Sequence, residues 1–170
     1  MEKEMDAGDI LSQRAIPIGE KDNCGMMFEK LSYLGRDLLL ETIDKLIEGQ
    51  IVPIKQDVSK VTFAYNVTKE EERLDFTKTA QEVYNHIRAY YPSPIAYTIF
   101  NGEILKIYES RVLDDTHNKE IGTFFLKDKT RICVACNNHT VLELLVVQPS
   151  GKKVMKAKDF ANGGFRKYLK

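Results

Sequence analysis

The chain has 170 residues, of which 43% are hydrophobic and 29% charged, with 25 basic and 25 acidic side chains. This length fits one domain or parts of two, and the apolar fraction excludes a wholly disordered chain. The zero net charge conceals a gradient: residues 1–75 hold 16 acidic and 10 basic side chains, residues 76–150 hold 8 of each, and residues 151–170 hold 1 acidic and 7 basic ones. The two ends of the chain therefore favour different partners.

The start of the chain and its cysteines indicate the compartment. Residues 2–9 carry 4 acidic side chains, which is unlike a secretory or transit peptide. No apolar run reaches the roughly 18 residues of a membrane span. The 3 cysteines are an odd number, which suits a reducing compartment better than a disulfide framework. We expect a cytoplasmic protein that does not bind membranes.

Cys133 and Cys136 have the spacing of a zinc or redox pair. They lie on a predicted strand, however, where positions three apart point to opposite faces. No second Cys/His pair completes four zinc ligands, although His139 is near in sequence. We therefore expect ordinary strand cysteines and no metal.

Residues 1–66 offer one strand and one helix. A short strand is predicted over residues 9–18. Asp22 and Asn23 both offer an N-cap and Gly49 a C-cap for a helix between them, which Gly35 is expected to break or kink. Its apolar positions recur at helical spacing: Met27, Leu31, Leu34, Leu38, Ile43, Leu46 and Ile47. Residues 50–68 carry Pro53 and mixed polarity, which predicts an extended connector.

One strand and one helix do not make a stable sheet, because a parallel sheet needs several βαβ units with both faces covered. The partners of residues 1–66 must therefore lie elsewhere. Either these residues cover the downstream domain, or they are the tail of a larger one. We favour the second interpretation.

Residues 67–170 read as a β-rich domain with a helix. Thr77 is predicted to cap a helix that ends before Pro92, because proline cannot continue it. Short β-type runs follow at 95–100, 103–113, 121–126, 130–136 and 140–148. Between them lie the predicted turns Asn101-Gly102, Asp114-Asp115 and Asn137-Asn138. Five short strands in about 55 residues predict a small closed barrel of the OB kind. A short helix is expected near residues 155–161.

Two segments carry chemistry. Glu4, Met5 and Asp6 precede a glycine turn and a predicted strand, where a carboxylate could orient a general base or a water; a plain acidic turn is the alternative. Four lysines stand within residues 152–158, and such a cluster makes a phosphate-seeking surface. Its alternative is a solvated tail.

Several segments follow one another in an order that resembles methionyl-tRNA formyltransferases. They are Met-Asp-Ala-Gly-Asp-Ile-Leu at 5–11, Lys-Leu-Ser-Tyr-Leu-Gly at 30–35, Lys-Glu-Glu-Glu-Arg-Leu-Asp at 69–75, Asn-His-Ile-Arg-Ala-Tyr at 85–90, Pro-Ile-Ala-Tyr-Thr at 94–98, Leu-Lys-Ile-Tyr at 105–108, Gly-Thr at 122–123 and Gln-Pro-Ser-Gly-Lys-Lys-Val-Met at 148–155. Each is weak alone, but the ordered series covers nearly the whole chain and is specific.

The resemblance implies a Rossmann-like formyltransferase domain followed by an OB-like domain. Residues 1–66 would be an α/β remnant of the first with its linker, and residues 67–170 the tRNA-binding second. The family transfers a formyl group from 10-formyltetrahydrofolate to the amino group of initiator methionyl-tRNA. Of its catalytic Asn, His and Asp, only the Asp has a counterpart, Asp6. We therefore expect the C-terminal part of such an enzyme, inactive alone, with Glu4, Met5 and Asp6 as its residual folate contacts.

The same resemblance predicts where tRNA binds. The candidates are basic side chains of the second domain: Lys69, Arg73, Arg88, Lys106, Lys152, Lys153, Lys156 and Lys158. The expected partner is initiator methionyl-tRNA and not DNA, and the full enzyme is expected to be a monomer. Two other interpretations stay open, a freestanding OB-type nucleic-acid-binding module and a formyltransferase acting on a nucleotide-sugar amine.

Overall fold

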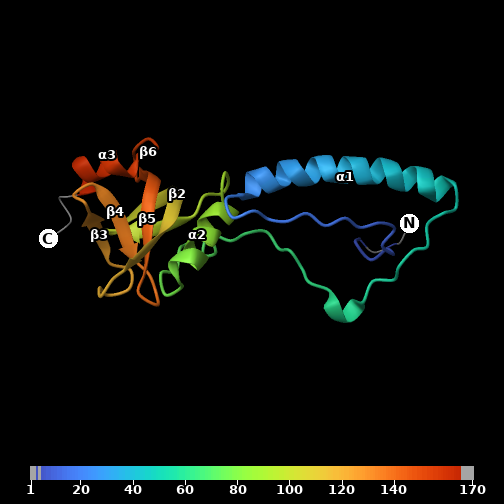
Figure 1. Cartoon of the computed structure of the whole chain (residues 1–170), viewed down its shortest axis with the longest axis horizontal. Helices are drawn as coiled ribbons and strands as arrows, with labels where there is room; N and C mark the ends of the chain where they lie inside the picture. The colour runs from blue at the N-terminus through green and yellow to red at the C-terminus, as the bar shows by residue number, and fades with distance from the viewer. Residues whose placement is uncertain (1–2, 4, 166–170) are drawn as a thin grey trace. The chain divides into compact units, whose positions relative to one another are not determined.

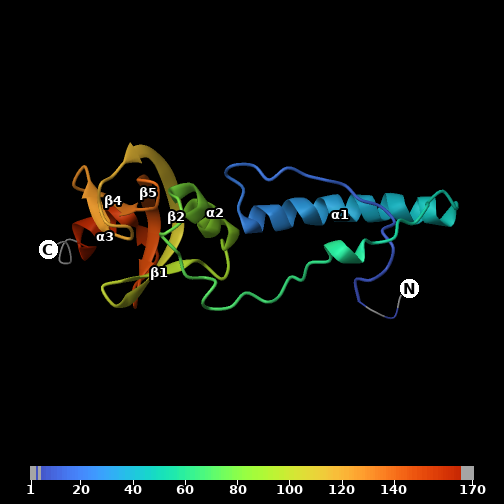
Figure 2. The same cartoon turned by 90° about the horizontal axis from the view of Figure 1, so that it is seen from below.

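The computed structural model describes residue 3 and residues 5–165. The contacts divide the chain into two compact units, Met1–Asn66 and Val67–Lys170, which are described separately below (Figures 1 and 2). Within the described residues, no helix combines the length and the apolar composition that crossing a membrane requires.

The first unit is built around one long helix, α1 (Cys24–Ile47). The Asn23 side chain accepts a hydrogen bond from the Met26 backbone N–H at 3.0 Å, which caps the first turn. The helix ends at Glu48 and is followed by Gly49 at φ +70°, a conformation that costs glycine little. Both predicted ends of the helix are confirmed, with Asn23 rather than Asp22 as the N-cap. The predicted break at Gly35 is wrong, because the helix continues through this residue.

The predicted strand over residues 9–18 is wrong. In the described structure this segment makes only one isolated antiparallel bridge, between Ile10 and Ile54, with N···O distances of 2.8 and 3.0 Å. A strand needs a neighbouring ladder for its backbone groups, and the first unit contains none. The connector that follows is extended except for one 3₁₀ turn, η1 (Val58–Lys60).

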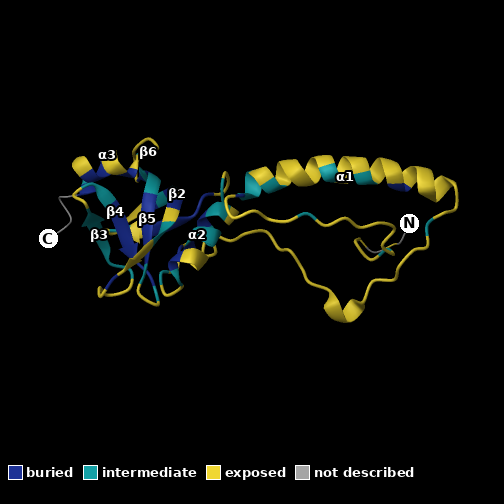
Figure 3. Cartoon of the chain, in the orientation of Figure 1, coloured by how far each residue is buried: buried dark blue, intermediate teal, exposed yellow. Residues whose placement is uncertain are grey.

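The first unit has almost no core (Figure 3). Among its described residues only Asp22 and Thr42 are buried, and both are polar. Large apolar side chains of α1 are exposed instead: Met26, Phe28, Leu31, Leu39, Leu40, Ile43, Leu46 and Ile47. So many exposed apolar side chains on one helix are typical of an interface rather than of a finished domain.

The second unit begins with the helix α2 (Ala80–Ala89). Its N-cap is Thr79, which forms a reciprocal capping box with Glu82. The prediction that Thr77 caps this helix is wrong, because the Thr77 hydroxyl and N–H both donate to the Asp75 carboxylate. The helix stops ahead of Pro92, as predicted.

Six strands form one antiparallel sheet in the order β1-β2-β5-β4-β3, with β6 added beside β5. The strands are β1 (Tyr97–Phe100), β2 (Glu103–Thr116), β3 (Phe124–Lys127), β4 (Arg131–Ala135), β5 (Thr140–Pro149) and β6 (Met155–Lys156). The predicted turn at Asp114 and Asp115 is wrong, since β2 continues through both with an irregular register. The two edge strands, β1 and β3, do not pair with each other in the described residues. Closure of the sheet into an OB-like barrel therefore stays a prediction.

The core of the second unit lies between the sheet and two helices, α2 and α3 (Ala157–Asn162). The buried cluster takes side chains from the three parts, among them Val83 and Ile87 of α2, Leu105, Ile107, Leu142 and Leu144 of the sheet, and Phe160 of α3. Strand residues alternate between this core and the opposite, solvent side of the sheet. That solvent side carries charged side chains, among them Lys106 and Arg111 of β2.

Candidate nucleic-acid interface

The acidic segment of the first unit is an exposed loop. Met5 is 91% exposed, and Asp6 has φ +59° and an exposed side chain. The loop is tied down through its backbone, because the Gln56 amide donates to the Asp6 carbonyl at 2.8 Å and to the Gly8 carbonyl at 2.6 Å. Glu4 lies outside the described residues. Among the described residues, no hydrogen bond or ion pair reaches the Asp6 carboxylate.

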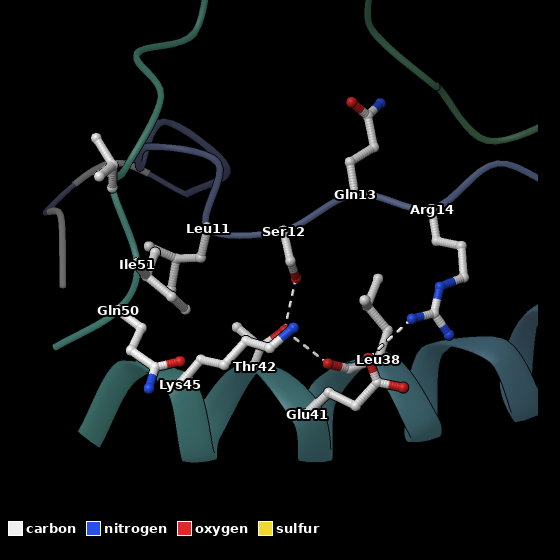
Figure 4. Close-up of a pocket in the computed structure, with 11 residues that line it drawn as sticks. Leu11, Ser12, Gln13, Arg14, Leu38, Glu41, Thr42, Lys45, Gln50 and Ile51 are labelled. Atoms are coloured by element: carbon white, nitrogen blue, oxygen red, sulfur yellow. Dashed lines mark hydrogen bonds and ion pairs between the residues drawn. The ribbon is translucent and has the colours of Figure 1, made fainter. Parts of the chain in front are cut away.

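A groove of about 380 Å³ lies elsewhere in the first unit, between α1 and two extended segments, residues 11–14 and 50–52 (Figure 4). Its polar groups pair with one another: Ser12 Oγ lies 2.6 Å from Thr42 Oγ1, and the Arg14 guanidinium donates to Glu41 at 2.8 Å. Asp6 is not among its lining residues. The groove is therefore a contact between the extended residues 11–14 and α1, and the carboxylate of Glu41 in it is paired with Arg14.

The second unit brings three strand residues into one row on the solvent side of its sheet. Tyr97 of β1 is the register partner of Lys106 of β2, and Lys106 is the register partner of Gln148 of β5. Partners in an antiparallel pair project to the same side. This side is opposite the core, because Leu105 and Ile107, the neighbours of Lys106, are buried in it.

Two further cations extend the row at its β1 end. Lys69 Nζ lies 4.7 Å from the centre of the Tyr97 ring, a cation–π contact, and also forms an ion pair with Glu72. Arg73 forms an isolated parallel bridge with Tyr97, so it extends the sheet beyond β1. The sequence alone separated these cations from Lys106 by about 35 positions, and the sheet brings them together.

Gln148 connects the row to the lysine-rich segment at its other end. Its amide oxygen accepts from the Tyr108 hydroxyl at 2.9 Å, and its amide nitrogen donates to the Lys152 carbonyl at 3.0 Å. The intervening turn closes through the Lys152 N–H and the Pro149 carbonyl at 3.0 Å, with Gly151 at φ +68°. The turn that carries Lys152 and Lys153 is thereby held against the row.

The remaining lysines of the cluster follow this turn. Lys156 of β6 is the register partner of Val146 and is exposed. Its neighbour Met155 packs against the core, so Lys156 projects to the solvent side. Lys158 is exposed on α3. The described structure thus joins Lys69, Arg73, Lys106, Lys152 and Lys156 through one sheet.

Arg88 is not part of this row. It lies on α2, where its Nε donates to Asn85 Oδ1 at 2.9 Å and its guanidinium stands 5.9 Å from the Tyr84 ring centre. These contacts hold Arg88 to its own helix. The row and Arg88 are therefore separate features of the second unit.

A second charged cluster was not predicted from the sequence. It is formed by Arg111 of β2, Glu143 of β5 and Arg131 of β4. Glu143 accepts from Arg131 at 2.7 Å through each of its oxygens and from Arg111 Nε at 2.5 Å. Its hydrogen bonds with Arg131 hold the pKa of this buried carboxyl below its usual range. The available signal was a lone carboxylate in the otherwise apolar run of residues 141–147.

The two cysteines of the sheet are buried, as expected for structural residues. Burial raises the pKa of Cys133 to about 11 and that of Cys136 to about 12. Cys136 belongs to the core cluster, whereas Cys133 is the register partner of Glu143 on the opposite side. The prediction that their spacing places them on opposite faces is confirmed.

The family model described as "Formyl transferase, C-terminal domain" matches residues 66–164. This chain belongs to that formyl transferase family. It is 47% identical over 169 residues to the methionyl-tRNA formyltransferase of Lactobacillus acidophilus, covering 99% of this chain and 54% of the relative. It is 48% identical over 163 residues to that of Streptococcus thermophilus, covering 96% and 51%. The resemblance found in the sequence is confirmed, and the chain spans about half the length of these curated relatives.

Solved structures of the formyl transferase fold are also similar. One is an N-formyltransferase from Helicobacter canadensis, solved with folinic acid and dTDP-3-aminofucose, with a TM-score of 0.61 and 22% identity, covering 88% of this chain and 53% of that one. Another is HypX from Aquifex aeolicus, with a TM-score of 0.68 and 16% identity, covering 98% and 30%. At these identities the likeness shows a shared fold.

Proposed function

We propose that this chain is the C-terminal half of a methionyl-tRNA formyltransferase, which transfers a formyl group from 10-formyltetrahydrofolate to the amino group of initiator methionyl-tRNA. The observation that carries the proposal is the identity of 47–48% to methionyl-tRNA formyltransferases across nearly the whole chain. The alternative substrate, a nucleotide-sugar amine, is supported only by structures at 20–22% identity. We further propose that Val67–Lys170 is the tRNA-binding part.

The row of cations supports tRNA binding by the second unit. Lys69 and Lys106 lie beside the largely buried Tyr97, and Gln148 connects the Tyr108 hydroxyl to the backbone of Lys152. Nucleic-acid-binding sheets combine basic side chains, which neutralise phosphates, with aromatic rings beside them. Such binding releases counterions and must weaken as salt increases.

The first unit supports a lack of catalysis by this chain alone. An amine attacking an activated formyl carbon produces an oxyanion, which needs positioned donors and a group that takes the amine proton. A bound cofactor is normally buried by 70–90% of its surface. Met5 and Asp6 are exposed and stand away from the groove of this unit, so the described residues do not fit a folate.

The exposed face of α1 supports the assignment of residues 1–66 to a larger catalytic domain. A 24-residue helix with one buried residue, Thr42, does not owe its apolar pattern to contacts within this unit. Burial of such a face stabilises a helix by roughly 25 cal/mol per Å² of apolar surface. We propose that the other half of the full-length protein covers it. Cytoplasmic location, a monomeric full enzyme and indifference to DNA and membranes stay predictions.

The test is binding of an initiator tRNA transcript to the 170-residue chain, measured by fluorescence anisotropy at 50–300 mM KCl. We expect affinity to fall steeply with salt, with a log–log slope of about −4 or steeper if the cations of the row each contact a phosphate. Absence of binding at 50 mM KCl, or a flat salt dependence, would contradict the proposal. Folate-dependent formylation of methionyl-tRNA by the chain would contradict its lack of catalysis.

A second candidate function is a freestanding nucleic-acid-binding module. The observation that favours it is the core of Val67–Lys170, which is complete without residues 1–66. Competition with elongator tRNA and with a structureless RNA of equal length separates the two. A formyltransferase half should prefer initiator tRNA, whereas a general module should bind all three alike.

A further inference from the structure

The second unit carries a charged cluster that lies apart from the lysine row. Glu143, with a side chain only 5% exposed, stands between Arg111 and Arg131 on the solvent side of the sheet. A carboxylate at this burial requires compensation by charge or hydrogen bonds. One guanidinium satisfies both of its oxygens, and the cluster contains two.

The two arginines are used differently. Arg131 is 29% exposed and is engaged at every nitrogen, with Nε and Nη2 on Glu143 and Nη1 on Asp128 at 3.3 Å. Arg111 is 55% exposed and touches Glu143 through Nε alone. Among the described residues, its Nη1 and Nη2 make no hydrogen bond. Arg111 therefore keeps its charge and its two terminal donors available to solvent.

We propose that Arg111, oriented by Glu143, is a second contact for an RNA phosphate on this sheet. The inference rests on the proposed tRNA-binding function and adds a site outside the lysine row. A guanidinium anchored at Nε presents Nη1 and Nη2 side by side, the arrangement that binds two oxygens of one phosphate. Because the anchor removes rotamer freedom in advance, less entropy is lost on binding than for a free lysine.

The position of Arg111 makes it a separate contact. Lys106 and Arg111 lie five residues apart on β2, which corresponds to about 16 Å along a strand. One phosphate cannot reach both. Lys106 lies between the core residues Leu105 and Ile107, so it projects to the solvent side. Glu143, the register partner of Arg111, lies between the core residues Leu142 and Leu144, so this pair projects to the same side; the irregular register between Ile107 and Ser110 shifts the alternation of β2. An RNA backbone following β2 would meet first one cation and then the other.

Glu143 is a positioning residue in this proposal, and its charge allows a test by sign. Glu143→Gln raises the net charge of the unit by one. If only charge mattered, the variant would bind RNA more tightly. If Glu143 orients Arg111, the variant binds more weakly in spite of the added positive charge, because the guanidinium loses its anchor.

The experiment measures binding of the initiator tRNA transcript by Arg111→Ala, Arg111→Lys, Glu143→Gln and the control Lys127→Ala, each against salt. Lys127 is the register partner of Arg131 and is ion-paired with Asp115, so its loss removes one charge from the same face at an ammonium group that already has a carboxylate partner. We expect Arg111→Ala to weaken tRNA binding about fivefold and to flatten the slope of log affinity against log salt concentration by about one. Arg111→Lys should restore this slope but not the affinity. The affinity of the control Lys127→Ala should stay within about twofold of that of the unaltered chain.

Equal losses for Arg111→Ala and Lys127→Ala, or tighter binding by a folded Glu143→Gln, overturn the proposal. If the Glu143→Gln chain does not fold, the comparison of Arg111→Ala with the control Lys127→Ala decides whether Arg111 contacts the RNA. If the unaltered chain does not bind tRNA, the proposed function fails, and titration with inorganic pyrophosphate still tests the site. A shift of the Arg111 Nε–Hε NMR signal then supports an anion site for free phosphate, and an unmoved signal overturns it.

Discussion

The two units contrast in how their regular structure is stabilised. The first contains the longest helix of the described chain, 24 residues, yet buries one side chain of it. The second contains two helices of 10 and 6 residues, each of which buries three. Length and capping are local properties, whereas burial depends on what else is present. The helix α1 therefore has the sequence of a packed helix, but the described residues of its unit do not provide the surface on which it would pack.

The same contrast holds for charge. Ion pairs of the first unit, such as Arg14–Glu41 and Arg36–Asp37, are exposed on both sides and contribute little. In the second unit a buried carboxylate organises two arginines, and the sheet aligns distant lysines. These arranged charges are the reason for proposing that the second unit, rather than the first, binds tRNA.

Cysteine reactivity should show the contrast most strongly. Cys24 is half-buried at the start of α1, whereas Cys133 and Cys136 are buried in the sheet with raised pKa values. Because the thiolate is the nucleophile, at pH 8 we expect alkylation of the two sheet cysteines at least about a hundredfold slower than in the unfolded chain. Mass spectrometry after iodoacetamide treatment should find Cys24 labelled first. Early labelling of Cys133 would contradict the packing of the sheet.

Two leucine-to-alanine substitutions, one in each unit, should have very different effects on the stability of the protein. Leu142→Ala removes a fully buried side chain from β5 and should lower the free energy of unfolding by about 3 kcal/mol, through lost burial and a cavity. Leu39→Ala in α1, where the side chain is 59% exposed, should change it by less than about 0.5 kcal/mol. Urea denaturation followed by circular dichroism measures both. A similar cost for the two would mean that α1 is covered in solution.

Two matched sets of lysine substitutions should separate the units by tRNA binding. Replacing Lys152, Lys153, Lys156 and Lys158 by alanine should weaken binding at least about tenfold and flatten the salt slope by about three. The control replaces Lys21, Lys45, Lys55 and Lys60 of the first unit and removes the same charge. If the two sets weaken binding equally, net charge rather than placed charge determines affinity.

The smallest expected effect concerns the turn that carries Lys152. Gln148→Leu removes the hydrogen bonds to Tyr108 and to the Lys152 carbonyl without changing any charge. We expect tRNA affinity to fall about two- to threefold with an unchanged salt slope, since the phosphates contacted stay the same in number. Binding isotherms at three salt concentrations distinguish a shifted intercept from a changed slope. An altered slope would mean that Gln148 affects more than the position of the turn.

Local signals predicted the elements of this fold well where the deciding residues are neighbours in sequence. Asn23 and Gly49 bound α1, and turn residues separate the strands of the second unit. The N-cap at Thr79 could also have been read from its capping box with Glu82, a better signal than Thr77. The strand at residues 9–18 was predicted wrongly, because the pattern encodes pairing with strands that the first unit does not contain.

By itself, the sequence determined the acidic and basic ends of the chain, the helices and strands of the second unit, and the family. Those properties follow from residue types and short spacings. The positions of Lys106 beside Tyr97 and of Arg111 beside Glu143 depend instead on the folded sheet. Strand pairing joins residues far apart in sequence, 32 positions in the case of Arg111 and Glu143, and which strands become neighbours is not encoded in the residues of one strand.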